Sequence, residues 1–409
     1  MTHLEIWANW SSRNQWQGMV SPRVLLVITA DDAAPPHKAG PRKDYWALAE
    51  ALGAGTIDRS RVKRGRLMSW LARYIGVAPI QAWLAFRERN HYDVILTDGE
   101  HIGIPLALLL KVSRSRVAHV TIGHRLTASK KRPFFTWLRV HSHINTILLH
   151  SRRQYELAID ELGIPAERLA LIPYQVDANF WQQLPEVTEE RLVCSAGLEF
   201  RDYPTLVRAV DGLDVEVVIG AASHWSKRHN TAVDQSLPSN VQVSAFDYEA
   251  LRRLYARSAI VVVPLDDIDF QAGVTTILEA MSMGKPVIVT HSLGQTDVVE
   301  DRRTATRGSE VRLRPTSLLR ELAESEGISV QPTGFYVPPE DSAALRRAIV
   351  HLLEHPDERR RLGSAGRETI ERLVTVDLFA ERVRQLVDAA VAQQPRARVA
   401  RPMPLASQQ

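Results

Sequence analysis

Cysteine is almost missing from this chain of 409 residues, because Cys194 is the only one. A single thiol excludes an internal disulfide and a zinc site built from several thiolates. The surrounding residues, 191–197, predict a buried strand, and a lone thiol in such a strand is typically an inert part of the core. We therefore expect no chemistry at Cys194.

Long apolar runs are also missing. A helix that spans a bilayer needs at least about 18 apolar residues, and the longest run here, Ile102 to Leu110, is much shorter and predicts a buried helix. The first twenty residues have neither the basic start nor the apolar centre of a signal peptide. From these two absences we expect a cytoplasmic protein.

Acidic side chains are scarce in the first half of the chain. Residues 1–185 contain 24 Lys and Arg against 15 Asp and Glu, a formal charge of +9, whereas residues 186–409 contain 27 against 32, a charge of −5. This asymmetry indicates that the first half faces something anionic.

Two basic clusters in this half precede aromatic, amphipathic stretches: 59–66 before Leu67–Ile75, and 130–132 before 133–138. Such stretches can dock on anionic lipid headgroups, which would place the protein at the inner face of the membrane. They can also be solvated helix starts over a packed core, which is the commoner case. No nucleic-acid-binding motif accompanies them, so we do not expect nucleic acid as a partner.

Two domains are expected, because single hydrophobic cores stop growing near about 250–300 residues. Uniformly apolar strands alternate with helices, which is typical of doubly wound parallel sheets in α/β proteins. The expected strands are 24–28, 92–97, 117–122 and 145–149, and the rhythm restarts with 192–195, 215–219 and 259–263. We expect a first Rossmann-like domain over 1–185, in which 1–22 can be an extension, and a second over 186–375, joined between Ile172 and Pro185. A helix over 376–392 and a disordered tail over 393–409 complete the prediction.

Residues 261–290 carry the strongest functional signal. They predict a strand, a loop, a helix that stops at Gly284, and a second strand. A helix start at the carboxyl end of a parallel strand offers unpaired N–H groups to an anion such as a diphosphate. Gly273 would let a phosphate approach the backbone, and the amides of 274–276 would point at it. Glu279, one turn deeper, can accept the hydroxyls of a ribose.

A second interpretation of the same segment involves no ligand. Thr276 and Glu279 have the spacing of a capping box, which stabilises a helix start by roughly 1 kcal/mol. Both interpretations are compatible with the segment taken alone.

The surrounding residues resemble the retaining glycosyltransferases of family 4, which have the GT-B fold of two Rossmann-like domains facing a central cleft. The resemblance covers about residues 90–390 and is specific in the second half. It rests on segments 279–287, 297–301, 334–341, 172–177 and 197–203. It implies transfer of a sugar from a nucleotide-sugar donor to an unidentified acceptor, without a cofactor or a metal. The helix over 376–392 would then pack back on the first domain.

The resemblance also implies roles for individual residues. Arg201 would neutralise the leaving diphosphate, and His124 would face the donor sugar from the first domain. Glu100 and His101 are candidates on the acceptor side. The donor-binding candidates are Gly197, Gln271, Ala272, Gly273, Val274, Thr275, Thr276 and Glu279.

Four departures from the family pattern leave donor and acceptor open. Gln271 stands where the family has a glutamate, which removes a charge beside the donor sugar. Leu198 stands where an arginine is expected, about thirty residues over 302–332 are inserted, and the loop over 31–44 lacks the usual glycines. Two alternatives therefore stay open: a nucleotide-sugar 2-epimerase of the same fold, and a non-catalytic partner protein.

Overall fold

A computed structural model describes residues 21–31, 40–220, 237–301 and 317–394. The expected extension over 1–22 and the tail over 393–409 fall almost wholly outside these residues, as do parts of the 31–44 loop and of the 302–332 insertion. Cys194 lies in a strand and is fully buried, as predicted, and burial raises the pKa of its thiol to about 12.

The first domain is built on a parallel sheet, in which the described residues form six strands in the order β2-β1-β3-β4-β5-β6. The strands are β1 (Val24–Val27), β2 (Gly55–Ile57), β3 (Val94–Thr97), β4 (Ala118–Gly123), β5 (Thr146–Leu149) and β6 (Leu169–Leu171). The helices are α2 (Asp44–Ala51), α3 (Arg59–Arg64), α4 (Arg66–Ile75), α5 (Val77–Glu88), α6 (Glu100–Ser113), α7 (Arg132–Thr136) and α8 (Arg152–Asp160).

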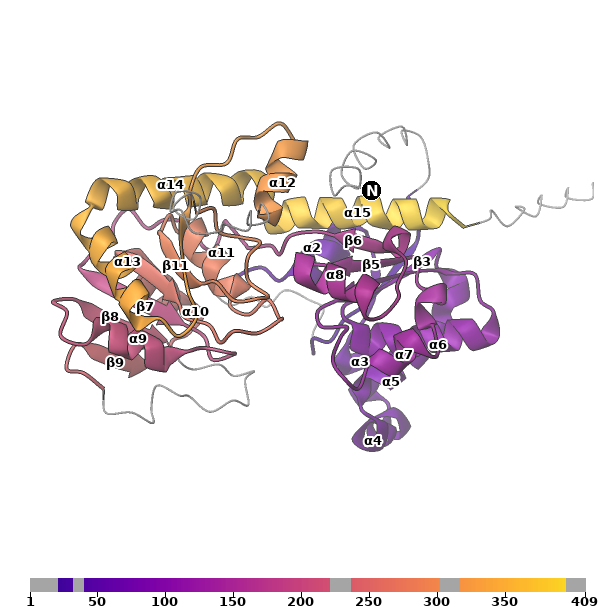
Figure 1. Cartoon of the computed structure of the whole chain (residues 1–409). Helices are drawn as coiled ribbons and strands as arrows, with labels where there is room; N and C mark the ends of the chain where they lie inside the picture. The colour runs from indigo at the N-terminus through magenta and orange to yellow at the C-terminus, as the bar shows by residue number, and fades with distance from the viewer. Residues whose placement is uncertain (1–20, 32–39, 221–236, 302–316, 395–409) are drawn as a thin grey trace, which may run out of the picture.

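The second domain repeats this design with six described strands in the order β12-β11-β10-β7-β8-β9. The strands are β7 (Leu192–Ala196), β8 (Glu216–Gly220), β9 (Val241–Ser244), β10 (Ile260–Val263), β11 (Val287–Thr290) and β12 (Gly334–Val337). The helices are α9 (Tyr203–Val210), α10 (Tyr248–Arg257), α11 (Val274–Ser282), α12 (Leu318–Ser325), α13 (Ser342–Glu354) and α14 (Pro356–Leu373). The two domains lie side by side (Figure 1).

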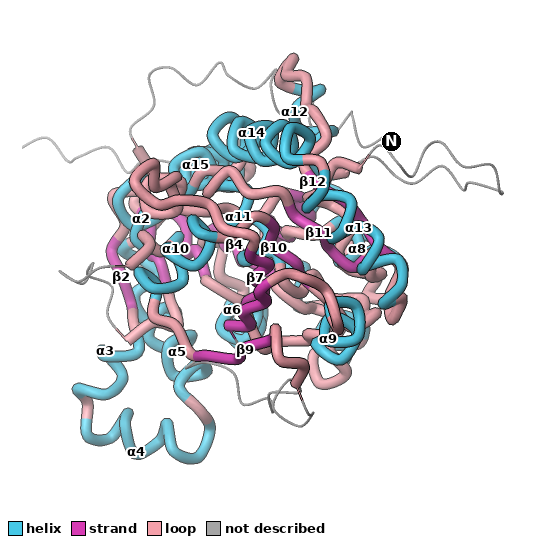
Figure 2. Tube along the Cα trace, turned by 90° about the vertical axis from the view of Figure 1, so that its left-hand side faces the viewer, coloured by secondary structure: helices cyan, strands magenta, loops and turns pink. Residues whose placement is uncertain are grey.

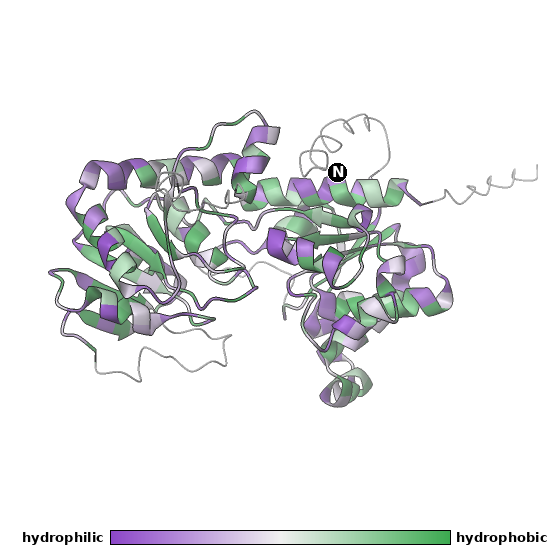
Figure 3. Ribbon diagram, in the orientation of Figure 1, coloured by the Kyte–Doolittle hydropathy of each residue, from purple (hydrophilic) through white to green (hydrophobic). Residues whose placement is uncertain are grey.

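Helices cover both faces of each sheet, which is why the central strands are apolar at every position. In the first sheet, Leu26 packs with one buried cluster and Leu25 with another on the opposite face. The strands are correspondingly hydrophobic and the outer faces of the helices hydrophilic in Figure 3. Every strand predicted from the sequence is present. The four edge strands, β2, β6, β9 and β12, were not predicted, because their segments are short and each includes partly exposed positions.

The chain crosses between the domains twice. The first crossing lies within the predicted junction, where the N–H of Val176 donates to the carbonyl oxygen of Val374 at 3.0 Å. The N–H of Val376 donates back to Val176, also at 3.0 Å, so the two crossings run side by side as a parallel bridge. After the second crossing, α15 (Val376–Ala392) returns to the first domain and packs on α2 and the sheet (Figure 1).

The described part of the insertion contains α12, which joins the domains through ion pairs. Glu321 of α12 pairs with Arg152 of α8 at 2.9 Å, and Glu326 pairs with Arg382 of α15 at 2.8 Å. Both arginines are buried. The inserted helix therefore fastens the second domain to two helices of the first.

Candidate active site

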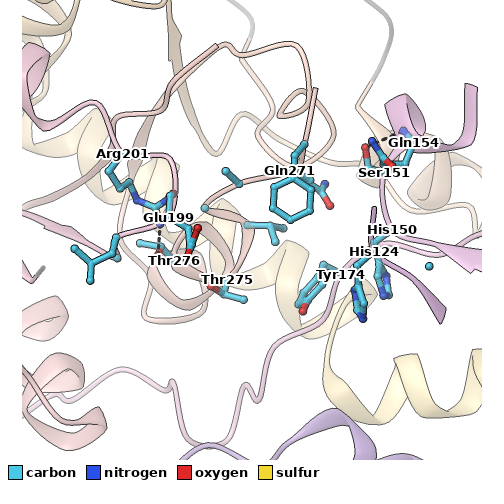
Figure 4. Close-up of a pocket in the computed structure, with 17 residues that line it drawn as sticks. His124, His150, Ser151, Gln154, Tyr174, Glu199, Arg201, Gln271, Thr275 and Thr276 are labelled. Carbon is cyan, nitrogen blue, oxygen red and sulfur yellow. Dashed lines mark hydrogen bonds between the residues drawn. The ribbon is translucent and has the colours of Figure 1, made fainter. Parts of the chain in front are cut away.

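A cavity of about 340 Å³ lies where the carboxyl ends of the two sheets meet. This volume is at the lower end of the roughly 300–1,000 Å³ found for small-molecule sites. Figure 4 shows side chains of the first domain on one side of it and the loops of the second domain on the other. It is lined by Gly123, His124, His150, Ser151, Gln154, Tyr174, Gly197, Leu198, Glu199, Arg201, Phe270, Gln271, Ala272, Gly273, Val274, Thr275 and Thr276.

The second-domain side of the cavity lies at the switch point of its sheet. β7 and β10 are neighbours, but the chain leaves β7 toward β8 and leaves β10 toward β11, so the loops after these two strands diverge and leave a crevice. Ligands of doubly wound sheets bind at such crevices. The loop after β7 is strained, since Phe200 has a φ of 54°, a value that residues other than glycine rarely adopt.

Arg201 is the buried cation of this crevice, with 7% of its surface exposed. Its guanidinium donates from Nε to the carbonyl oxygen of Ala196 at 3.0 Å, from Nη1 to that of Glu199 at 2.7 Å, and from Nη2 to Oγ1 of Thr276 at 3.2 Å. No carboxylate among the described residues forms an ion pair with it. Burial lowers the pKa of Arg201, yet an arginine stays charged. A buried cation held only by neutral acceptors is suited to an anionic ligand.

The helix start predicted at Gly273 is present, because α11 begins at Val274 and Gly273 is its N-cap. Gly273 has a φ of 75°, and a Cβ at this position would lie 2.8 Å from Cγ1 of Val263. The alternative of a capping box at Thr276 is wrong, since the helix starts two residues earlier and no side chain caps it. Thr276 holds Arg201 instead, so the first-turn amides and the guanidinium face the same cavity.

Gln271 lies in a braced loop just before α11. The amide of Gln295 donates to the carbonyl oxygen of Ala272 at 2.9 Å, and the N–H of Gly294 donates to that of Ile268 at 2.7 Å. The side chain of Gln271 is buried and lines the cavity. Leu198, at the other departure from the family pattern, lines the cavity too and adds no charge to it.

Glu279 lies on α11 one turn beyond the cavity and is not one of its lining residues. Its Oε2 accepts a hydrogen bond from the hydroxyl of Tyr255 at 3.2 Å. Burial raises the pKa of Glu279 to about 7, against the lowering effects of Tyr255, Lys43 and Arg201. The ligand-free carboxyl is therefore close to half protonated at neutral pH.

The first domain contributes His124, His150 and Tyr174, which lie together in Figure 4. The rings of His124 and His150 stack at 6.1 Å, and those of His150 and Tyr174 meet edge-on at 4.7 Å. Burial lowers the pKa of His150 to about 3, so its ring is neutral. Because Nδ1 of His150 bonds the carbonyl oxygen of Ile172 at 2.9 Å, this nitrogen carries the proton and Nε2 is left as an acceptor.

Glu100 and His101, the acceptor-side candidates, are the first two residues of α6, with Gly99 as N-cap. Neither lines the cavity. The buried carboxylate of Glu100 accepts the backbone N–H groups of His124 at 2.9 Å and Arg125 at 3.2 Å, and it pairs with Lys131. The Lys131 ammonium lowers the pKa of Glu100 to about 2, against the raising effect of burial. Glu100 thus fixes the backbone that presents His124, whereas His101 is exposed.

His150, Gln154 and Tyr174 also line the cavity but were not identified from the sequence. His150 directly follows β5, just as His124 follows β4. Its position at the carboxyl end of a predicted strand is a signal that could have found it. Tyr174 lies in the segment 172–177 that resembles the family, but its place beside the cavity depends on the chain crossing that follows β6.

Comparison with known proteins found one matching family model, glycosyl transferases group 1, over residues 200–355. Similar solved structures include a glycosyltransferase from Rickettsia africae, with 13% identity and a TM-score of 0.63 over 92% of this chain and all of that one. A sucrose-phosphate synthase from Thermosynechococcus elongatus has 18% identity and a TM-score of 0.62 over 90% and 99%. HepE of Anabaena, in complex with UDP, has 15% identity and a TM-score of 0.60 over 90% and 100%. The chain has the GT-B fold.

The GT-B architecture confirms the predicted fold class, and the second half contains a glycosyl transferases group 1 domain. No curated protein sequence matched the chain. Within the described ranges, no cluster of three or more His, Cys, Asp or Glu has the arrangement of a metal site. No helix in the part of the chain that the structure describes is long and apolar enough to cross a bilayer.

Proposed function

We propose that this GT-B protein is a retaining glycosyltransferase of family 4, which moves a sugar from a nucleoside-diphosphate donor to an acceptor hydroxyl. The observation that carries the proposal is the buried guanidinium of Arg201, which faces the same cavity as the first-turn amides of α11 and forms no ion pair with a described carboxylate. HepE, a structural neighbour, was solved with UDP and with UDP-glucose, which supports a nucleotide donor.

In this proposal the diphosphate lies between Arg201 and the start of α11. Fixed donors aimed at a leaving group stabilise the charge that develops as its bond to the sugar breaks. Arg201 and the amides of Val274 and Thr275 supply this stabilisation, so the transfer needs no metal. Gly197 and Gly273 leave room for the phosphates, because a Cβ at either position would crowd the guanidinium, at 2.5 Å and 3.3 Å from its nitrogens.

The sugar then extends toward the first domain, between Gln271 and the imidazole of His124. The amide of Gln271 can donate to and accept from sugar hydroxyls, so it replaces a carboxylate without its charge. Glu100, through the backbone of residues 124 and 125, is a positioning residue rather than part of the acceptor site. The ribose lies toward Glu279, whose carboxylate accepts its hydroxyls.

A thermal-shift screen with UDP, GDP, ADP and dTDP and their sugars tests this proposal, because a ligand of the folded state raises the melting temperature. We expect one base to raise the Tm of the wild type. Arg201→Ala is expected to weaken that nucleotide by roughly 10- to 100-fold, because charge-assisted hydrogen bonds contribute about 1.5–3 kcal/mol. Arg208→Ala, an exposed arginine on α9, is the matched control. Unchanged nucleotide affinity in Arg201→Ala would refute the assignment.

Product analysis separates the remaining activities. NMR can identify the anomer that slow hydrolysis of an α-linked donor releases first. Release of the α-anomer indicates a retaining transferase. Conversion of the donor to its 2-epimer without an acceptor indicates an epimerase, and absence of binding to all nucleotides indicates a non-catalytic partner.

A further inference from the structure

The helices α3 and α4 form a surface, residues 59–75, that the proposed transfer does not use. It contains six basic side chains and no acidic one. In Figures 1 and 2 its second helix, α4, projects from the first domain as a separate tip. We refer to residues 59–75 as the α3–α4 surface.

The apolar side of α4 is uncovered. None of its residues is buried, and the exposed fractions are 65% for Leu67, 52% for Trp70, 73% for Tyr74 and 57% for Ile75. Residues 67, 70 and 74 follow helical spacing and share one face. The rings of Trp70 and Tyr74 pack on each other at 5.0 Å and on no other described aromatic ring. Figure 3 shows hydrophobic and hydrophilic residues together on this tip.

The base of the surface is firmly held, so α4 is not a frayed end. Val62 of α3 is fully buried, and the side chain of Asp58 caps α3 through the N–H of Arg61 at 2.9 Å. Arg61 pairs with Glu88, and Lys63 pairs with Asp31 at 2.6 Å. The other four basic residues, Arg59, Arg64, Arg66 and Arg73, have no ion-pair partner among the described carboxylates.

We propose that the α3–α4 surface docks the protein on an anionic lipid bilayer, with the apolar face of α4 in the headgroup region. An exposed helix with Trp, Tyr and Leu on one side and arginines beside them has the composition of an interfacial helix. A second copy of this chain is a poorer occupant, because a symmetric contact would bring the same cationic, acid-free surfaces together. An anionic bilayer satisfies both the charge and the apolar face.

The second basic cluster of the first domain does not share this property. Lys131 pairs with the buried Glu100, and Arg132 pairs with Glu161. Two of its three charges are therefore matched within the domain, although the neighbouring Trp137 is 82% exposed. The second cluster therefore keeps one unmatched charge, whereas the α3–α4 surface keeps four.

The surface also has a defined position relative to the cavity. The N–H of Arg59 donates to the carbonyl oxygen of Ala30 at 2.9 Å, just after β1, so α3 starts at the carboxyl edge of the first sheet. The side chains of His124 and His150 follow strands at that same edge. Docking would hold the first-domain side of the cleft near the lipid.

Sedimentation with vesicles tests the docking. We expect the full chain to bind vesicles in which about a third of the lipid is phosphatidylglycerol and to bind phosphatidylcholine vesicles much more weakly, with salt weakening the former. Arg64→Glu with Arg66→Glu should weaken binding by at least roughly 25-fold, since each basic residue near an anionic bilayer contributes about a fivefold factor and the introduced carboxylates are repelled by the lipid. Trp70→Ala with Tyr74→Ala should weaken it by about tenfold or more.

The controls lie in the second domain. Arg360→Glu with Arg361→Glu makes the same charge change on the exposed face of α14, and Leu293→Ala removes an exposed apolar side chain of the second domain. Both should bind as the wild type does. Equal binding to neutral and anionic vesicles, or wild-type binding by either double variant of the α3–α4 surface, would overturn the proposal. Concentration-dependent dimers that the Trp70 and Tyr74 changes abolish would assign the surface to a second copy instead. Circular dichroism and Tm check that the variants are folded.

Discussion

Glu279→Gln tests how the carboxyl group of Glu279 affects the stability of the folded protein. The amide has the shape of the protonated carboxyl and can still accept the hydrogen bond of the Tyr255 hydroxyl, which lies at 3.2 Å in the wild type. The difference between the two proteins is therefore the free energy of holding an ionised carboxylate at this site. Burial raises the pKa of Glu279 from 4.5 to about 7.

The sign and size of the effect follow from linkage. The folded state retains the proton at higher pH than the unfolded state, so stability is full below pH 4.5 and falls as the pH rises toward 7. A shift of this size corresponds to roughly 3 kcal/mol, and the partial exposure of the side chain reduces it to about 2 kcal/mol. Glu279→Gln should thus be as stable as the wild type near pH 4.5 and more stable by about 2 kcal/mol at pH 8.

Urea denaturation over this pH range, followed by circular dichroism, measures the difference. Nucleotide affinity measured in parallel should fall in the variant, because an amide accepts ribose hydroxyls less strongly than a carboxylate does. If Glu279 serves ligand binding at a cost in stability, the Glu279→Gln variant should gain stability and lose nucleotide affinity. A stability difference that does not vary with pH, or a variant less stable at pH 8, would refute the reasoning.

Two further substitutions test other parts of the structure. Gly273→Ala should lower stability by about 2 kcal/mol and weaken nucleotide binding, because it combines a φ of 75° with a contact of 2.8 Å to Val263. Gly212→Ala, at a φ of 68° with open space around it, isolates the backbone strain, and equal losses in both variants would contradict the steric part. Arg152→Met should lower stability by about 3 kcal/mol, since it removes the cation that pairs with the buried Asp297 and the half-buried Glu321. The loss should be larger at pH 8 than at pH 5, because burial raises the pKa of Asp297 to about 6 and its protonation relieves the unpaired charge. Arg153→Met is the exposed control, and denaturation curves at both pH values decide whether the α12 ion pairs stabilise the domain arrangement.

The central strands of both sheets and the start of α11 were predictable, because each depends on local features. Strands buried on both faces are apolar throughout, and the glycine before Val274 marks the helix start. The crevice between β7 and β10 follows from the same local pattern, because carboxyl ends of parallel strands always meet at one edge.

Other features depend on contacts between distant segments. The helix α14 was missed because its sequence is rich in charges and contains two glycines, which weaken a helix prediction. Gly363 is required by packing, since a Cβ there would lie 2.0 Å from the carbonyl oxygen of Gly284. The role of Glu100 in holding the backbone of His124 could not be predicted from the sequence either. It depends on the position of the first residue of α6 beside the loop that follows β4.

The paired crossings at Val176 and Val374 have a consequence for how the molecule can be divided and how it can move. The first domain is discontinuous in sequence, because its sheet is covered by α15 from the far end of the chain. A fragment ending at the first crossing would expose the apolar surface that Phe379 and Val383 cover, so the smallest self-contained unit must include residues 376–392. Because both connections lie side by side and are hydrogen-bonded to each other, they define one axis near which the domains can turn. A movement that opens the cavity would therefore be a rotation about this two-stranded hinge. The ion pairs of α12 with Arg152 and Arg382 would have to break first.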